Sequence, residues 1–211
     1  SQEQTFNDFT YLFETQKISS NSQEMIEFFH LIMKISKNHH RDQAFFQKIE
    51  QIFLYLKDHI KQTFSNTEIF NFFSNSKPIL LLLFKNNIIT IDKAISYLIL
   101  NKNKGNKYRK YRYFFFNEIK PFINFGMQKM IEREYNGLGS NILTNFEEKR
   151  QKGENDFYVC SLIRNDSIEE FVTYVNQTNF SLLNKIPFSI FETNTFLLDK
   201  NPTLIEYSAF Y

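Results

Sequence analysis

Apolar residues recur at intervals of three and four positions through most of this 211-residue chain. Such spacing places the apolar side chains along one face of an amphipathic helix. The longest run of this kind extends from Phe45 to Phe64, which corresponds to about five helical turns. The segment from Ile79 to Phe84 is apolar on every side, which predicts a helix that is buried all round. A sustained alternation of apolar and polar residues is missing, so the pattern predicts an all-α protein without a sheet of three or more strands.

Several helix starts are marked by a serine or threonine that is followed three positions later by a glutamate. In such a capping box the hydroxyl accepts a hydrogen bond from the backbone of the glutamate, and the glutamate side chain accepts one from the backbone of the first residue. Thr90 is predicted to cap another helix, and Pro78 lies where the first turn of a helix tolerates proline. The predicted capping boxes begin at Ser65, Thr144, Ser167 and Thr203.

The stretch from Asn155 to Gln177 predicts two short helices that fold back on each other across a turn at Asn165-Asp166. One stripe of the second helix is expected to be buried, so that Ile168→Ala and Phe171→Ala should each cost about 2–5 kcal/mol of stability. A lone pair of helices cannot bury both of its faces, so another element must stack on it. The stripe consists of Ile168, Phe171, Val172 and Val175.

The last residues of the sequence, N-P-T-L-I-E-Y-S-A-F-Y, resemble the opening of an ankyrin repeat, whose first helix begins T-P-L-H-x-A. Thr203, Ile205 and the Ser208-Ala209 pair fall on the threonine, leucine and alanine positions of that motif. Leu204 stands in place of the motif's proline, and Glu206 stands in place of its histidine. The start of this helix would therefore be closed by a capping box and not by the usual bond between threonine and histidine.

Together with the stretches I-R-N-D-S-I-E-E-F-V-x-Y-V and S-I-F-E-T-N, this segment resembles a large family of protist ankyrin-repeat proteins, which carry an uncharacterised helical module before their repeats. The specific resemblance covers residues 153–211. It implies an N-terminal helical domain at 1–153, built as a bundle or as stacked helix pairs, and an ankyrin-like helix pair with the truncated start of the next repeat at 154–211. The function that it implies is a non-enzymatic protein–protein interaction scaffold, and it carries over no catalytic residue.

Partner binding is expected from the connection that follows the helix pair and from the apolar residues of the last helix. In ankyrin-like arrays such connections project towards partners, although the same side chains could instead tuck under the loop and extend the core. The last helix lacks a neighbour to cover it, so its apolar residues are also expected to mediate self-association. The predicted contact residues are Phe188, Ile190, Phe191 and Phe196 in the connection, and Leu204, Ile205, Tyr207 and Phe210 in the helix.

Residues 102–112, K-N-K-G-N-K-Y-R-K-Y-R, carry six basic side chains, two tyrosines and no acid. Basic side chains bind phosphates and aromatic rings stack on unpaired bases, so the alternative function is binding of nucleic acid or of another anionic surface. The competing interpretation is a solvated loop between two helices, and a net charge of only +2 argues against a nucleic-acid partner. The residues that would bind the anion are Lys107, Arg109, Lys110 and Arg112.

Other candidate chemistry is sparse. Cys160 is the single cysteine, so an internal disulfide is impossible and a reducing compartment fits. The first residues do not form a signal peptide and the longest apolar run is too short to span a bilayer, so we expect a cytoplasmic protein. The sequence contains no glycine-rich phosphate loop, no G-x-S-x-G and no H-E-x-x-H motif. We therefore expect no enzymatic activity, no catalytic residue, no cofactor and no metal site.

Overall fold

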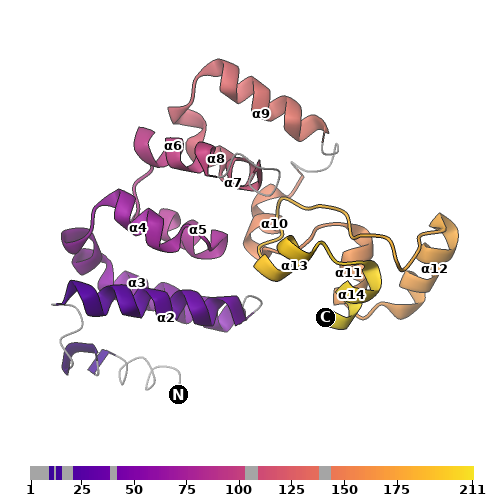
Figure 1. Cartoon of the computed structure of the whole chain (residues 1–211), viewed down its shortest axis with the longest axis horizontal. Coiled ribbons are helices and arrows are strands. Elements are labelled where there is room, and N and C mark those ends of the chain that lie inside the picture. The colour runs from indigo at the N-terminus through magenta and orange to yellow at the C-terminus, as the bar shows by residue number, and fades with distance from the viewer. Residues whose placement is uncertain (1–9, 12, 16–20, 39–41, 103–108, 138–143) are drawn as a thin grey trace. The chain divides into compact units, whose positions relative to one another are not determined.

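The regular structure of this chain is helical (Figure 1). None of the described residues lies in a strand of a sheet, and the isolated antiparallel bridge found among them joins Lys185 to Thr203. The prediction of an all-α protein is therefore confirmed. The computed structural model describes residues 10–11, 13–15, 21–38, 42–102, 109–137 and 144–211.

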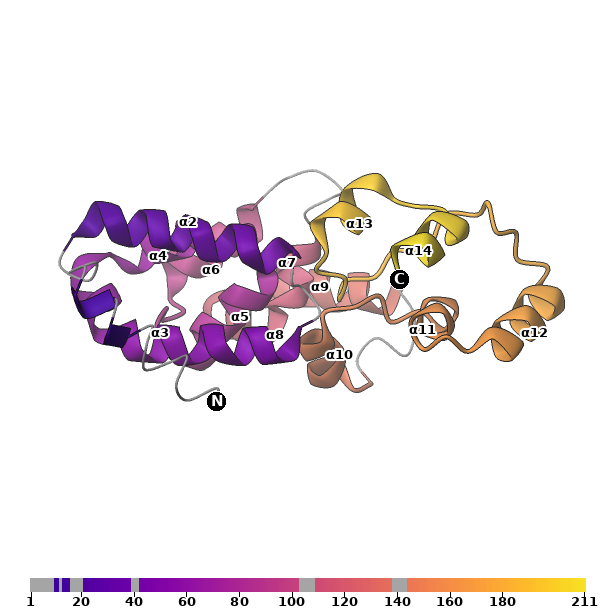
Figure 2. The same cartoon turned by 90° about the horizontal axis from the view of Figure 1, so that it is seen from below.

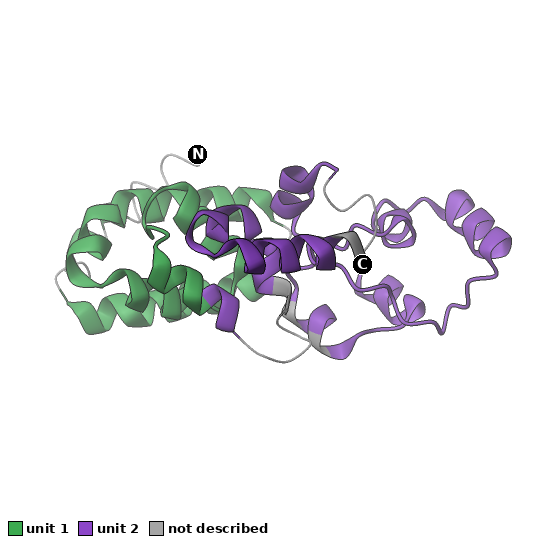
Figure 3. Ribbon diagram, turned by 90° about the horizontal axis from the view of Figure 1, so that it is seen from above, with its two compact units in different colours: residues 1–98 green, residues 99–211 purple. Residues whose placement is uncertain are grey.

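Two compact units make up the chain, residues 1–98 and residues 99–211 (Figure 3). The boundary between them falls within helix α6 (Lys93–Asn101). The predicted division between residues 153 and 154 lies inside unit 2, and it stays a prediction. The helix pair and the segment that precedes it thus belong to the same compact unit.

Unit 1 contains α2 (Ser22–Asn38), α3 (Gln43–Thr63), α4 (Asn66–Phe73) and α5 (Lys77–Lys85). Helix α2 contacts α3 and α4, and α4 contacts α5. Aromatic rings dominate the interior, because the ring of Phe29 has four phenylalanine rings at centroid distances of 5.0 to 6.3 Å. These rings belong to Phe53, Phe64, Phe72 and Phe73. The long apolar stripe predicted for α3 is confirmed as part of this core, with Ile49, Phe53, Leu56 and Ile60 buried.

Side-chain caps set the starts of these helices. The capping box predicted at Ser65 is present at the start of α4, with both of its hydrogen bonds formed. The prediction for Thr90 was wrong, because Asp92 accepts the bond from the backbone N–H of Ile95 at 2.8 Å. The backbone of Thr90 instead exchanges two hydrogen bonds with the side-chain amide of Asn66. The helix therefore begins two residues later than the threonine suggests.

Unit 2 is built from shorter helices that enclose two apolar clusters. Its helices are α7 (Arg109–Phe114), α8 (Phe116–Ile119), the 3-10 helix η2 (Lys120–Phe122), α9 (Phe125–Gly137), α10 (Phe146–Lys152), α11 (Tyr158–Arg164), α12 (Ile168–Thr178), α13 (Thr195–Lys200) and α14 (Leu204–Phe210). The first cluster, core A, consists of Tyr113, Phe116, Ile131, Tyr135, Phe146, Ile190 and Phe191. The second cluster, core B, consists of Val159, Cys160, Ile186, Leu197, Leu204 and Tyr207.

Two of the capping boxes predicted for unit 2 are not formed, whereas the one at Thr203 is present at the start of α14. Helix α10 begins after Asn145, which has a φ of 54° and makes no side-chain cap bond, so the box predicted at Thr144 was wrong. Helix α12 begins after Ser167, whose hydroxyl also caps nothing. A capping residue needs extended backbone, and Ser167 departs from it with a ψ of 68°.

Helices α11 and α12 pack against each other across the predicted turn, where Asp166 has a φ of 53°. Figures 1 and 2 both show α12 at the outer edge of unit 2. The stripe predicted to be buried is divided: Phe171 and Val175 are half-buried, whereas Ile168 is 65% and Val172 is 50% exposed. The expectation of a costly Ile168→Ala was therefore wrong, because amphipathic spacing shows which side chains share a face and not whether a neighbour covers that face.

Candidate functional site

Two of the predicted contact residues, Ile190 and Phe191, are buried in core A. The ring of Phe191 meets the ring of Phe146 edge to face at a centroid distance of 5.3 Å. A backbone hydrogen bond of 2.9 Å from the N–H of Thr193 to the carbonyl of Gly153 holds this segment against the end of α10. The prediction of these two residues as partner contacts was wrong, and the competing interpretation of a core extension is correct for them.

Other members of the predicted contact set do reach the surface. Phe188 and Phe196 are 42% and 53% exposed, and Ile205 on α14 is 50% exposed. The ring of Phe196 stacks on that of Phe210, with centroids 5.8 Å apart and planes inclined by only 11°. The stacked rings of Phe196 on α13 and Phe210 on α14 therefore lie at the edge of the exposed surface of these helices.

Leu204 and Tyr207, by contrast, are completely buried in core B. Helix α14 packs against α11, so the chain's own helix covers these two side chains. The prediction that they lie open on the last helix was therefore wrong. Of the four residues predicted there, Ile205 is exposed and Phe210 is half-buried.

A buried polar contact fastens α14 to α11. Arg164 donates from Nη1 to the hydroxyl of Tyr207 at 2.8 Å, and its Nε lies 3.0 Å from a carboxylate oxygen of Glu154. The rings of Tyr207 and Tyr211 pack with their centroids 4.6 Å apart. Burial raises the pKa of Cys160, which lies in the same core, to about 12. Because the thiolate is the nucleophile, this cysteine is a core residue and not a reactive centre at neutral pH.

The predicted anion-binding segment is described only in part. Lys107 and the side chains of Arg109 and Lys110 lie outside the described part of the chain. Arg112 is described, and its Nη2 lies 2.5 Å from a carboxylate oxygen of Glu134. Arg112 is thus already engaged by a carboxylate of its own unit, and its role in anion binding stays a prediction.

The first residue of that segment is likewise engaged within unit 2. The Nζ of Lys102 lies 5.0 Å from the centroid of the Tyr111 ring, a distance at which a cation and an aromatic face attract each other. Burial lowers the pKa of Lys102 to about 8. This lysine therefore contacts an aromatic face of its own chain.

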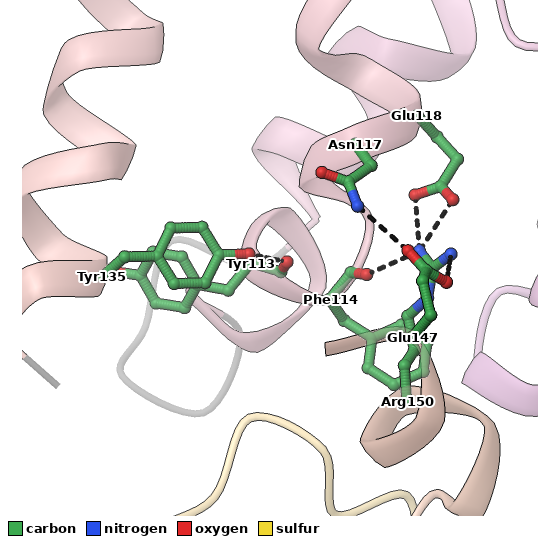
Figure 4. A network of polar contacts seen from close by, with 7 residues as sticks. All are labelled: Tyr113, Phe114, Asn117, Glu118, Tyr135, Glu147 and Arg150. Carbon is green, nitrogen blue, oxygen red and sulfur yellow. Dashed lines mark hydrogen bonds and ion pairs between the residues drawn. The ribbon is translucent and has the colours of Figure 1, made fainter. Parts of the chain in front are cut away.

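A polar network surrounds Arg150 of α10 (Figure 4). Its Nη1 lies 2.7 Å from both carboxylate oxygens of Glu118 and donates to the carbonyl of Phe114 at 3.1 Å. Its Nη2 donates to Glu147 at 2.6 Å, and Glu147 also accepts a bond of 3.0 Å from the side chain of Asn117. The side chains bind one another, so this network joins α10 to α7 and α8 and has the character of a structural contact.

An exposed surface lies on α12, where the sequence predicted a buried stripe. Ile168 and Val172 are one helical turn apart and are both exposed, and we call this pair the α12 ridge. Glu169 is exposed beside it, Asp166 is exposed in the turn before the helix, and Glu170 is exposed on the opposite side of α12. None of these three carboxylates pairs with a cation among the described residues. The sequence marks this surface through the apolar stripe and through the acidic residues of α12, which contains no basic ones.

Within the described residues, no cluster of three or more His, Cys, Asp and Glu side chains is arranged to hold a metal ion. None of the helices in the described part of the chain is both long enough and apolar enough to cross a membrane. No protein family, curated protein or solved structure matches this chain.

Proposed function

We propose that this chain is a non-enzymatic protein–protein interaction scaffold of the ankyrin-repeat type, acting in the cytoplasm. The observation that carries the proposal is the exposure of large apolar side chains on the C-terminal helices of unit 2. Ile168, Val172, Phe196 and Ile205 are each at least half exposed. Helix pairs of repeat arrays leave apolar side chains uncovered where the next repeat or a partner packs.

Three features support the ankyrin-like assignment within this proposal. Two helices joined by a tight turn are followed by a long connection that contains the short helix α13, and then by α14, which packs against the first helix of the pair. The helix α14 begins with a capping box at Thr203, at the position of the threonine in the T-P-L-H-x-A motif. The small side chains of Ser208 and Ala209 lie exposed on α14, where they would let another helix approach closely.

The cytoplasmic assignment is supported by the free thiol of Cys160, which is buried and unpaired with another cysteine. Reducing compartments keep such thiols in that state. Expression of a fluorescent fusion in the native cell, followed by fractionation, tests the assignment. Recovery in a secreted or vesicular fraction would contradict it.

Affinity capture from a nuclease-treated extract of the native cell tests the scaffold function. We expect wild-type protein to retain a defined partner that the double variant Phe196→Ser/Ile205→Ser loses while its far-ultraviolet circular dichroism is unchanged. The control variant Leu31→Ser, at an exposed residue of unit 1, should retain the partner. Capture that disappears when nucleic acid is digested would instead support anion binding through residues 102–112.

Self-association through the C-terminal helix belongs to the same proposal. Because Leu204 and Tyr207 are buried, the contact would depend on Ile205 and Phe210. Sedimentation velocity over about two decades of concentration should show growth of a larger species, and Ile205→Ser should reduce it. A single monomeric species at all concentrations would count against this contact.

A further inference from the structure

The region around α12 has an unusual charge for this chain. From Asn165 to Asn184 the sequence contains three carboxylates, Asp166, Glu169 and Glu170, and no lysine, arginine or histidine. The chain as a whole has a formal net charge of +2, so this acidic stretch contrasts with the remainder. The nearest preceding base, Arg164, is engaged by Glu154 and Tyr207.

The same region exposes an apolar ridge. Residues four apart lie on one helical face, so the side chains of Ile168 and Val172 form one continuous row. The row adjoins Phe171, which packs against core B, and the half-buried Val175. On the helix, Glu169 borders the row on the side away from the core. The surface is therefore an apolar stripe with the carboxylate of Glu169 along its outer edge and Asp166 in the turn before it.

The spacing of the ridge favours a helical occupant. Rows of residues four apart on one helix fit the grooves between such rows on another helix. An extended peptide would need backbone groups to pair with, and the described residues contain no strand of a sheet that could offer them. A second α12 would not complement the charge, because its residues include no lysine or arginine.

We propose that the α12 ridge binds an amphipathic helix of a partner protein whose apolar stripe is flanked by lysine or arginine. This inference rests on the proposed scaffold function and names the chemistry of the partner. The apolar stripe would cover Ile168 and Val172, and the flanking cations would pair with Glu169 and with Asp166 in the turn before the helix. Such rim pairs set the orientation of binding and make it dependent on ionic strength.

The probe for this test is a synthetic helical peptide of leucine and lysine with leucines at helical spacing, labelled for fluorescence anisotropy. Its matched control replaces every lysine with glutamate. We expect the leucine–lysine peptide to bind the full chain and the leucine–glutamate peptide not to bind. The double variant Ile168→Ser/Val172→Ser should weaken binding about tenfold or more, because two aliphatic side chains lose their burial.

Two further variants separate a specific contact from simple attraction of opposite charges. The double charge variant Asp166→Asn/Glu169→Gln should weaken binding and should remove most of its dependence on salt. Leu183→Ser, at a residue of unit 2 that is 74% exposed and outside the ridge, should leave binding unchanged. The substituted residues of the ridge are exposed, so circular dichroism should show an unchanged fold in each variant.

Several outcomes would overturn the inference. One is binding that responds to the double charge variant Asp166→Asn/Glu169→Gln but not to Ile168→Ser/Val172→Ser, because that would be non-specific attraction. Equal binding of the leucine–glutamate peptide, or no binding of either peptide, would also overturn it. Self-association that Ile168→Ser/Val172→Ser abolishes would assign the ridge to a second copy of the chain. None of these outcomes changes the affinity-capture result, so the scaffold function is judged separately.

Discussion

At the scale of single residues, a substitution in the interior of unit 2 is destabilising where a buried polar group depends on a few hydrogen-bond or ion-pair partners. The guanidinium of Arg150 lies over the rings of Phe114 and Phe146, at 5.9 and 5.5 Å from their centroids. The hydroxyl of Tyr135 donates to the carbonyl of Tyr113, and burial raises the pKa of Tyr135. Removing one partner of such a contact leaves the other without compensation, which costs more than the contact itself contributes.

Arg150→Ala is therefore expected to reduce the free energy of unfolding by about 3 kcal/mol, because Glu118 would be left in a mostly buried position without its partner. Urea titration followed by circular dichroism measures the change. The matched control is Lys152→Ala on the same helix, whose ion pair with Glu148 is exposed on both sides. That variant should leave the unfolding midpoint nearly unchanged. Equal effects of the two substitutions would show that burial does not decide how much these ion pairs contribute to the free energy of unfolding.

Cys160 is expected to resist alkylation in the native protein. With a pKa of about 12, its thiolate fraction at pH 8 is on the order of one in ten thousand, and only the thiolate reacts. Iodoacetamide at pH 8 should leave the native chain unmodified for hours and should label it completely in urea, as mass spectrometry can show. Rapid labelling of the folded chain would contradict the burial of this side chain.

The same pKa shift predicts how stability depends on pH. Because the folded pKa of Cys160 lies above the unfolded value of about 8.5, its contribution to stability is complete below that value and is lost as pH rises towards 12. The unfolding midpoint in urea should therefore fall above about pH 9. In Cys160→Ala the fall between pH 8 and pH 11 should be smaller than in the wild type, and an identical fall would contradict the assignment.

At the scale of elements, α12 and α14 show how similar sequence signals lead to different structures. Helix α12 has an apolar stripe of which only part is covered. Helix α14 has its two inward residues completely buried, because α11 and the connection pack on them. A helix at the edge of a unit is thus distinguished from a covered helix by its neighbours and not by its own pattern.

Truncations along α12 should separate its two faces. Ile168→Ala should change the free energy of unfolding by no more than about 0.5 kcal/mol, as expected for a surface position. Phe171→Ala should cost about 1–3 kcal/mol, which is less than for a fully buried phenylalanine because this ring is half-buried. Thermal unfolding of the two variants gives the comparison. A larger effect for Ile168 than for Phe171 would show that the ridge is covered in solution.

The helix caps at Thr203 and Ser167 can be compared with a second matched pair of variants. Thr203→Ala should cost about 1 kcal/mol, because the hydroxyl accepts the bond from the backbone N–H of Glu206 that closes the start of α14. Ser167→Ala should have a much smaller effect, because the hydroxyl of Ser167 caps nothing. Urea unfolding midpoints of the two variants test this difference. Equal losses would mean that the box at Ser167 forms in solution.

At the scale of the whole molecule, the contacts of unit 2 cross the position at which the sequence predicts a domain boundary. Core A joins Tyr135 and Phe146, which precede residue 153, to Phe191, which follows it. An ion pair of 3.1 Å between Lys149 and Asp156 crosses the same position. The hydroxyl of Ser189 donates to the other carboxylate oxygen of Asp156 at 2.7 Å.

A fragment of residues 154–211 should therefore fold poorly, because it loses five of the seven residues of core A and exposes the other two, Ile190 and Phe191. The longer fragment 99–211 keeps both cores of unit 2 and should retain a cooperative thermal transition. Circular dichroism of the two purified fragments measures the difference. A cooperative transition in 154–211 alone would support the boundary that the sequence predicts at 153/154.

The sequence by itself determined the helical character of the chain and much of its division into helices. The apolar stripe of α3, the capping box of α4 and the proline at the start of α5 were all predicted correctly. These features are local, because a helix forms through bonds between residues four apart and is closed by side chains within one turn. Ser167 and Thr203 show the limit of such reasoning, because both were predicted to begin a capping box and of the two only Thr203 does so. Thr203 is held extended by its bridge to Lys185, whereas Ser167 leaves a tight turn with a different ψ.

Only the tertiary structure decided which apolar and charged side chains are covered. Ile190 and Phe191 lie in a connection that the sequence marks as a contact surface, and they are buried because α10 lies against them. Arg112 belongs to a basic segment, but Glu134 on α9 forms an ion pair with it. The α12 ridge is exposed because no described element packs on it. Burial depends on the contacts of residues that are far apart in the chain, and periodicity along the chain does not contain that information.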